Sequence, residues 1–257
     1  MSRTWKRTRP PPSSGKAPES ATQRLELLFG KEGLERVARA KVLVVGVGGV
    51  GSWCAESLVR SGVRRVALMD DDVVVPSNLN RQLEATSKTV GLPKVEAMAA
   101  RLREVAPDCE AEPIARFYEK GCGIDLSAYD VVVDAIDTMR SKIELALDCA
   151  AAGTKLFSSM GAARKLDPTQ VRAASVWKTD GCPLAREVRR RLRAAGFGGD
   201  YECVYSAEAP RGTVVPPESA PAGTLRKTTC GSAAPVVAAF GLALSSLAVR
   251  FLLGSRS

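Results

Sequence analysis

Four glycines and one carboxylate are spaced as a nucleotide site requires. Gly46, Gly48 and Gly51 form a GxGxxG pattern within KVLVVGVGGVGSW, and Gly49 lies inside it. A turn of this kind, between an apolar strand and a helix, directs the amides of the helix N-terminus at a phosphate. Asp70 ends the next apolar stretch, where a carboxylate could accept both ribose hydroxyls. These features fit NAD and ATP equally well.

Two cations that follow Asp70 favour ATP. Arg81 lies in the stretch DDDVVVPSNLNRQ, and Lys94 lies in VGLPK. A dehydrogenase keeps its pyrophosphate intact, whereas an enzyme that displaces pyrophosphate needs positive charge where negative charge builds up. Arg81 can donate two parallel hydrogen bonds to phosphate oxygens, and Lys94 supplies a point charge. We therefore assign catalytic and ATP-binding roles to Arg81 and Lys94.

Asp137 is the candidate magnesium ligand. It lies at the end of the predicted strand YDVVVDAIDT, where its carboxylate could hold a Mg²⁺ ion that bridges phosphates. Asp134 and Asp137 could instead cap the helix that follows. We favour the metal role for Asp137 and a structural role for Asp134.

The composition excludes several kinds of chemistry. The chain of 257 residues has no histidine, which removes Ser-His-Asp triads, Cys-His dyads and HExxH metal sites. Its 7 cysteines include no pair at zinc-knuckle spacing, so we expect free thiols in a reducing, cytoplasmic compartment. The net charge of +9 favours a polyanionic partner, and nucleic acid is the obvious candidate.

Alternating apolar and amphipathic segments predict an α/β fold: a doubly wound, mostly parallel sheet with an antiparallel C-terminal extension. The predicted strands are 41–48, 64–72, 110–117, 129–138 and 155–161, with 170–178 on the antiparallel side. The predicted helices are 22–40, 51–62, 93–107, 140–153 and 182–196. In the first helix, Leu27, Leu28, Leu34 and Val37 are candidates for one buried stripe.

Two segments are predicted to lie outside the packed core. Residues 1–21 form a basic, proline-containing tail that we expect to be disordered, and organellar targeting by this tail stays open. Residues 22–257 form one domain, in which the Pro- and Gly-rich stretch 207–227 should be a mobile loop near the site. The uncharged run 228–249 is long enough to span a membrane, but its Ala, Ser, Gly and Pro content favours a packed helix.

The combined motifs resemble the adenylating domain of the ubiquitin-activating superfamily. They are GVGGVG, the D-x-D of Asp70 and Asp72, NLNRQ, VGLPKVE and DAIDT. This resemblance implies a Rossmann-like fold, a homodimer, and coupling of a carboxylate to AMP with ATP and Mg²⁺. It also implies that Asn78 helps near the ribose and phosphate. Arg24 resembles an arginine that some relatives insert into the ATP site of the partner subunit.

Within the superfamily the strongest resemblance is to the tRNA threonylcarbamoyladenosine dehydratases. It rests on RLELLFGKEGLERV, on LDPTQVRAASVWKTDGCPLAREVRRRLR and on CVYSAEAP with the final uncharged helix. This resemblance implies a tRNA substrate whose side-chain carboxylate is adenylated and then attacked from within the same side chain. A sulphur donor or carrier protein is a possible partner.

Three alternatives stay open. The chain could adenylate the C-terminus of a ubiquitin-like or sulphur-carrier protein, although it has no paired CxxC motifs. It could be an NAD-dependent oxidoreductase, or a silent module that holds nucleotide. Cys203 and Cys230, assigned to the mobile region, could be nucleophiles but are more simply small apolar residues. The arginines of 182–196 could contact tRNA phosphates or form a solvated helix face.

Overall fold

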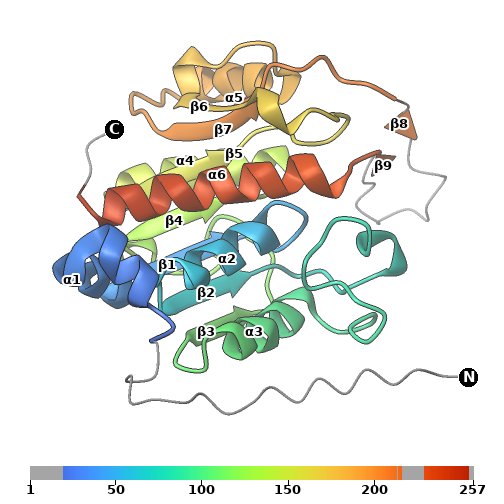
Figure 1. The fold of residues 1–257 in the computed structure, drawn as a ribbon. Coiled ribbons are helices and arrows are strands. Elements are labelled where there is room, and N and C mark those ends of the chain that lie inside the picture. The colour runs from blue at the N-terminus through green and yellow to red at the C-terminus, as the bar shows by residue number, and fades with distance from the viewer. Residues whose placement is uncertain (1–19, 213, 216–228, 255–257) are drawn as a thin grey trace, which may run out of the picture.

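A central sheet of seven strands carries the fold of this computed structural model, which describes residues 20–212, 214–215 and 229–254 (Figure 1). The strand order is β3-β2-β1-β4-β5-β7-β6. The strands are β1 (Lys41–Val45), β2 (Arg65–Met69), β3 (Glu110–Ile114), β4 (Val131–Asp134), β5 (Lys155–Ser159), β6 (Val171–Ser175) and β7 (Glu202–Ser206). All neighbours pair in parallel except β6 and β7, which are antiparallel. The predicted fold class is confirmed.

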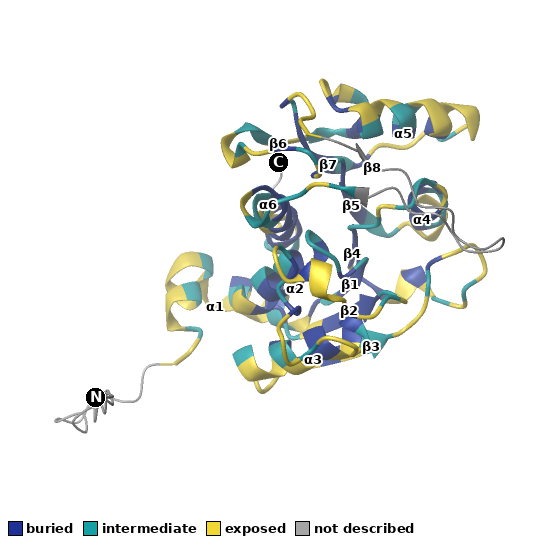
Figure 2. Cartoon of the chain, turned by 90° about the vertical axis from the view of Figure 1, so that its right-hand side faces the viewer, coloured by how far each residue is buried: buried dark blue, intermediate teal, exposed yellow. Residues whose placement is uncertain are grey.

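Helices cover both faces of the sheet (Figures 1 and 2). One face carries α1 (Gln23–Arg39), α2 (Gly51–Arg60), α3 (Lys94–Val105) and α6 (Ala234–Leu252), and the other carries α4 (Met139–Ala152) and α5 (Pro183–Ala194). In β1, Val42 and Val44 face the first layer while Leu43 and Val45 face the second. This is why the strand is a continuous apolar run rather than an alternating one.

Short elements complete the chain. Single 3-10 turns form at η1 (Pro76–Asn78), η2 (Leu126–Ala128), η3 (Pro168–Gln170) and η4 (Val176–Lys178). A two-stranded ladder joins β8 (Val214–Val215) to β9 (Thr229–Cys230). Residues 1–19 of the predicted tail 1–21 and most of the predicted loop 207–227 lie outside the described residues.

The last helix, α6, packs against α2. It is the one helix in the described ranges that is long and apolar enough to cross a membrane, with a mean hydropathy of 1.8, and half of that window is buried in the protein. At Gly241 the two helices approach so closely that a Cβ would lie 2.5 Å from the carbonyl oxygen of Val50. The expectation of a closely packed terminal helix is therefore met, with Leu242 and Phe251 left exposed.

Two expectations about local structure are wrong. Val37 is buried, but Leu27 and Leu28 are 84% and 76% exposed. The helix kinks at Gly30, and its first half turns Leu25 and Phe29 toward the protein instead, with Leu25 beside Gly62 and Phe29 against the core. Cys203 does not lie in a mobile region. It is fully buried in β7, an inner strand of the sheet that the sequence did not predict.

Candidate functional site

The glycine turn lies at the carboxyl edge of the sheet, where the strand order reverses between β1 and β4. Residue 51 must be glycine, because a Cβ at Gly51 would lie 1.8 Å from the carbonyl oxygen of Gly46. Gly46 has a φ of 91° and lies against the carbonyl of Ala135. Gly48 has open space around it apart from the Gln82 amide, so its backbone is accessible to a phosphate.

Asp70 ties the turn to the end of β2. Its Oδ2 accepts the N–H of Val47 at 2.7 Å, and its Oδ1 accepts the N–H of Asp72 at 2.9 Å. Burial raises the pKa of Asp70 above its ordinary value, although the nearby Lys94 acts in the opposite direction. Asp70 thus fixes the loop through both carboxylate oxygens. Each oxygen keeps a second lone pair that could accept a ribose hydroxyl, as the sequence predicted.

Lys94 is brought to this edge by the start of α3. Its side chain is only 7% exposed, and its Nζ donates to Oδ2 of Asp72 at 2.8 Å. The same Nζ lies 4.0 Å from Oδ1 of Asp70. An ammonium group that is almost completely buried between two carboxylates can bind a phosphate strongly, because burial weakens the screening of its charge by water.

Asn78 and Arg81 belong to the segment after β2, at the right-hand edge in Figure 1. Asn78 is buried and its Oδ1 accepts the N–H of Val75, so it builds the η1 turn. The alkyl chain of Arg81 lies beside Gly49, and its Nη1 donates to the carbonyl of Ser77 and to Oδ1 of Asn80, each at 2.9 Å. The structure thus brings Arg81 to the turn, with its guanidinium held by its own segment.

The two aspartates after β4 have different surroundings. Asp134 is buried, and its Oδ2 accepts a hydrogen bond from Lys142 Nζ at 2.6 Å and another from the Ser158 hydroxyl at 2.6 Å. Its Oδ1 accepts the N–H of Ile136, which fixes the turn that lies against Gly46. Asp137 is exposed beyond that turn, and the hydroxyl of Thr138 donates to its Oδ1 at 3.3 Å. Asp134 is thus bonded into the fold, whereas Asp137 is exposed three residues after β4, and its metal role stays a prediction.

Sequence reasoning missed two buried polar residues beside the turn. Gln82 is 7% exposed, its amide nitrogen lies 3.7 Å from the Cβ position of Gly48, and its Oε1 has no hydrogen-bond partner in the described ranges. Glu84 is 2% exposed, and neither of its carboxyl oxygens has a partner among the described residues. Gln82 could have been found because it ends the NLNRQ motif, whereas nothing in the sequence marks Glu84 as buried.

Thiol chemistry has little support. Burial raises the pKa of the Cys203 thiol to about 12, so it stays protonated. Cys230 is half-buried in β9. Within the described residues, the one group of candidate metal ligands is Asp70, Asp71 and Asp72, and no cysteine belongs to it.

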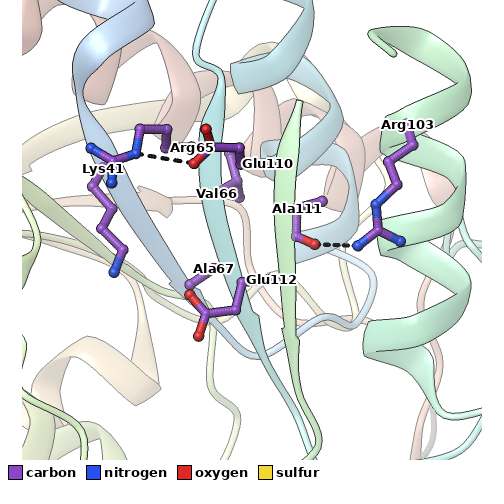
Figure 3. A pocket seen from close by; sticks show the side chains of 8 residues that line it. All are labelled: Lys41, Arg65, Val66, Ala67, Arg103, Glu110, Ala111 and Glu112. Carbon is purple, nitrogen blue, oxygen red and sulfur yellow. Dashed lines mark hydrogen bonds and ion pairs between the residues drawn. The ribbon is translucent and has the colours of Figure 1, made fainter. Parts of the chain in front are cut away.

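The hollow of about 250 Å³ drawn in Figure 3 lies elsewhere. Lys41, Arg65 and Glu110 begin β1, β2 and β3, so the hollow reaches the amino ends of these strands, opposite the glycine turn. Arg65 bonds Glu110 at 3.3 Å, and Arg103 bonds the carbonyl of Ala111. It does not contribute to the nucleotide site.

Comparison with known proteins agrees with this geometry. Residues 21–257 match the ThiF family. The chain belongs to the ThiF family. It is 45% identical over 189 residues to the tRNA threonylcarbamoyladenosine dehydratase of Bacillus subtilis, covering 73% of this chain and 74% of that protein. The Escherichia coli dehydratase is 36% identical over 241 residues, with 87% of this chain and 90% of that protein covered.

Solved structures extend the agreement to the fold of this ThiF family member. The Escherichia coli tRNA N6-threonylcarbamoyladenosine dehydratase in complex with ATP superposes with a TM-score of 0.77 and 34% identity. The match covers 90% of this chain and 93% of that one. A complex of the same enzyme with AMP gives a TM-score of 0.78 and 32% identity.

Proposed function

We propose that this ThiF family protein is an ATP-dependent tRNA threonylcarbamoyladenosine dehydratase. The observation that carries the proposal is the carboxyl-edge site itself. The glycine turn, Asp70 and Lys94 meet there, in a chain that matches an ATP-bound dehydratase over nearly its whole length. We assign residues 22–257 to one adenylating domain.

The nucleotide is held by the residues that surround the turn. The backbone of Gly48 and Gly49 and the N-terminus of α2 bind phosphate, Asp70 binds the ribose, and Lys94 leaves Asp72 to bind phosphate oxygens. Arg81 turns its guanidinium from its own segment to the leaving pyrophosphate, and Asn78 keeps that segment in place. Asp137 would hold a Mg²⁺ ion, which would supply positive charge to the phosphates.

The reaction needs little acid–base chemistry from the protein. The side-chain carboxylate of the modified adenosine attacks the α-phosphorus of ATP and expels pyrophosphate. An atom of the same side chain then attacks the activated carbonyl, closes a ring and releases AMP, with net loss of water. Because both groups belong to one side chain, positioning carries much of the rate. A chain without histidine can perform these steps.

The tRNA is proposed to lie along α5. This helix carries Arg186, Arg189, Arg190, Arg191 and Arg193 against the single carboxylate of Glu187. Its first residues lie beside Gly161, just past the carboxyl end of β5, since Leu184 is 3.5 Å from the Cβ position of that glycine. An RNA that places an adenosine at the carboxyl edge would therefore extend its phosphates along the arginines.

A homodimer would cover the exposed first half of α1. Arg24, Leu27 and Leu28 share one helical face, and both leucines are exposed. A second copy that covers the leucines would also receive Arg24, as the proposed insertion of this arginine into the partner's ATP site requires. The seven cysteines are free, which supports a reducing, cytoplasmic compartment. A sulphur-donor partner stays a hypothesis.

The deciding experiment supplies ATP, Mg²⁺ and tRNA that carries threonylcarbamoyladenosine. We expect AMP and pyrophosphate to form, and mass spectrometry of the nucleoside to show the loss of one water. Arg81→Ala should lower turnover by about two orders of magnitude or more, since it removes charge from the leaving group. Arg39→Ala, in the exposed pair with Glu35, is the matched control and should keep wild-type turnover.

Two results would count against the dehydratase. Unchanged tRNA in the presence of ATP hydrolysis would remove the proposed substrate. Formation of AMP only after addition of a carrier protein with a Gly-Gly C-terminus would support the carrier-activating alternative.

A further inference from the structure

Glu84 is a buried acid in the nucleotide site with no role so far. It lies two residues after Gln82, its side chain is 2% exposed, and neither carboxyl oxygen accepts a well-formed hydrogen bond from the described chain. Native proteins rarely leave a buried carboxylate without partners, because its charge loses the stabilisation by water. A neutral carboxylic acid tolerates such surroundings far better.

The groups around Glu84 belong to three elements. The Ser52 hydroxyl comes from α2, Lys94 from α3, and Asp70 from the end of β2. The pKa of Glu84 is raised to about 7, chiefly by burial and to a lesser extent by the charge of Asp70, while its own backbone N–H, Lys94 and the Ser52 hydroxyl act in the opposite direction. Lys94 is the one cation among these groups. Its Nζ already forms ion pairs with Asp72 Oδ2 at 2.8 Å and with Asp70 Oδ1 at 4.0 Å.

Arrival of a triphosphate changes this balance in one direction. ATP adds several negative charges beside Lys94. These charges offset the positive charge of Lys94, which in the free protein favours the ionised form of Glu84. Negative charge nearby makes a carboxyl hold its proton more tightly. The loop cannot simply turn Glu84 away, because its own carbonyl accepts the Thr89 hydroxyl at 2.7 Å and the Leu83 N–H is bonded to Ser52.

We propose that Glu84 is a positioning residue of the ATP site that takes up a proton when ATP binds, so that Lys94 can serve the phosphates alone. The proposal rests on the nucleotide site assigned above. ATP binding is then linked to pH. Because the complex holds the proton more tightly than the free protein, ATP affinity falls as pH rises above about 7, by up to tenfold for each pH unit.

The test is calorimetry of Mg²⁺-saturated ATP binding at pH 7.5 and 8.5, in two buffers of different ionisation enthalpy. The wild-type protein should take up a proton, up to one per ATP bound, and lose up to tenfold in affinity between the two pH values. Glu84→Gln should take up fewer protons per ATP bound, and its affinity for ATP should be nearly the same at the two pH values. Glu96→Gln makes the same change at an exposed position on α3 and should behave as wild type.

The outcomes separate the two proposals. If wild type binds no ATP, the proposed function fails. If wild type binds ATP without proton uptake, or if Glu84→Gln takes up as many protons as wild type, Glu84 has no such role. The ligand's own titration is common to all variants, so it cancels in their comparison. Should Glu84→Gln not fold, infrared difference spectra of wild type with and without ATP decide: a gained carboxylic-acid carbonyl band supports the proposal, and its absence overturns it.

Discussion

Single residues at the glycine turn differ in what they are for, although the motif treats them alike. At Gly51 no side chain fits, whereas at Gly48 the nearest atom to a Cβ would be the Gln82 amide nitrogen at an ordinary 3.7 Å. Gly51 is therefore required by the fold, and Gly48 is required for access of the ligand to the backbone.

This difference predicts opposite results for two alanine variants. Gly51→Ala should lose about 3 kcal/mol or more of unfolding free energy, because the methyl group overlaps the Gly46 carbonyl. Gly48→Ala should stay within about 1 kcal/mol of wild type but bind ATP more weakly, because its methyl group stands where a phosphate approaches. Urea unfolding and ATP titration of both variants test this pair. Equal stability of the two would show that the turn differs from the one described.

The sequence predicted residues at this scale where the backbone imposes a requirement. The glycines, Asp70 and Lys94 meet at one edge because parallel strands end together there. It failed where burial depends on distant parts of the chain. Glu84 follows a polar motif and precedes a polar loop, yet α2, α3 and β2 enclose it. Leu27 and Leu28 have the right spacing for burial, but the helix packs Leu25 and Phe29 against the protein instead.

At the scale of elements, α5 combines a buried and a charged face. Ala185, Val188 and Leu192 are fully buried against the second layer. Four of the arginines are exposed, Arg186, Arg190, Arg191 and Arg193, whereas Arg189 is half-buried and bonds the Thr179 hydroxyl. Some of the arginines are held in place: Arg190 and Arg191 bond Glu187, and Arg193 lies 5.3 Å from the ring of Trp177. Guanidinium groups fixed in this way lose less freedom when they bind phosphates.

Neutralising part of this face should weaken tRNA binding selectively. The double variant Arg186→Gln with Arg190→Gln should bind tRNA more weakly and reduce the slope of log affinity against log salt by about 2, since each phosphate that is no longer neutralised accounts for about 1. ATP binding should not change. A double control, Arg39→Gln with Arg60→Gln, removes the same charge from exposed sites on α1 and α2. Filter binding at several salt concentrations decides, and an unaltered slope would exclude α5 from the RNA surface.

The strand β7 shows why elements were harder to predict than residues. Its five residues, ECVYS, are too few and too mixed in polarity to stand out, yet Cys203, Val204 and Ser206 are fully buried. The strand is buried because it pairs on both sides, with β5 and with β6. Such pairing is a long-range property, which local patterns do not contain.

At the scale of the whole molecule, the two most exposed large apolar side chains of the described residues, Leu27 and Leu28, lie together on the first half of α1. Leu27 and Leu28 extend past the kink at Gly30 and contribute little to the core of this chain. Two large apolar side chains exposed on one helical face favour association with another surface. A second copy of this chain would bury them and bring Arg24 into contact with its partner.

The oligomeric state tests this arrangement. We expect a dimer by light scattering, and a monomer for the double variant Leu27→Gln with Leu28→Gln. Leu166→Gln, at a site 64% exposed elsewhere on the surface, is the control and should remain dimeric. A monomeric wild type, or a double variant of unchanged mass, would contradict the arrangement.

The packing of α6 on α2 has a consequence for synthesis of the protein on the ribosome. Gly241 packs on the first turns of α2, Val237 lies beside Gly49, and the carbonyl of Ser232 accepts a hydrogen bond from Asn80. The turn and α2 are translated well before the residues of α6 that cover them. A nascent chain can therefore pair β1 with β2 and β4 long before its nucleotide site is complete. Until α6 emerges from the exit tunnel, the apolar face of α2 is exposed, and it is there that a chaperone would bind.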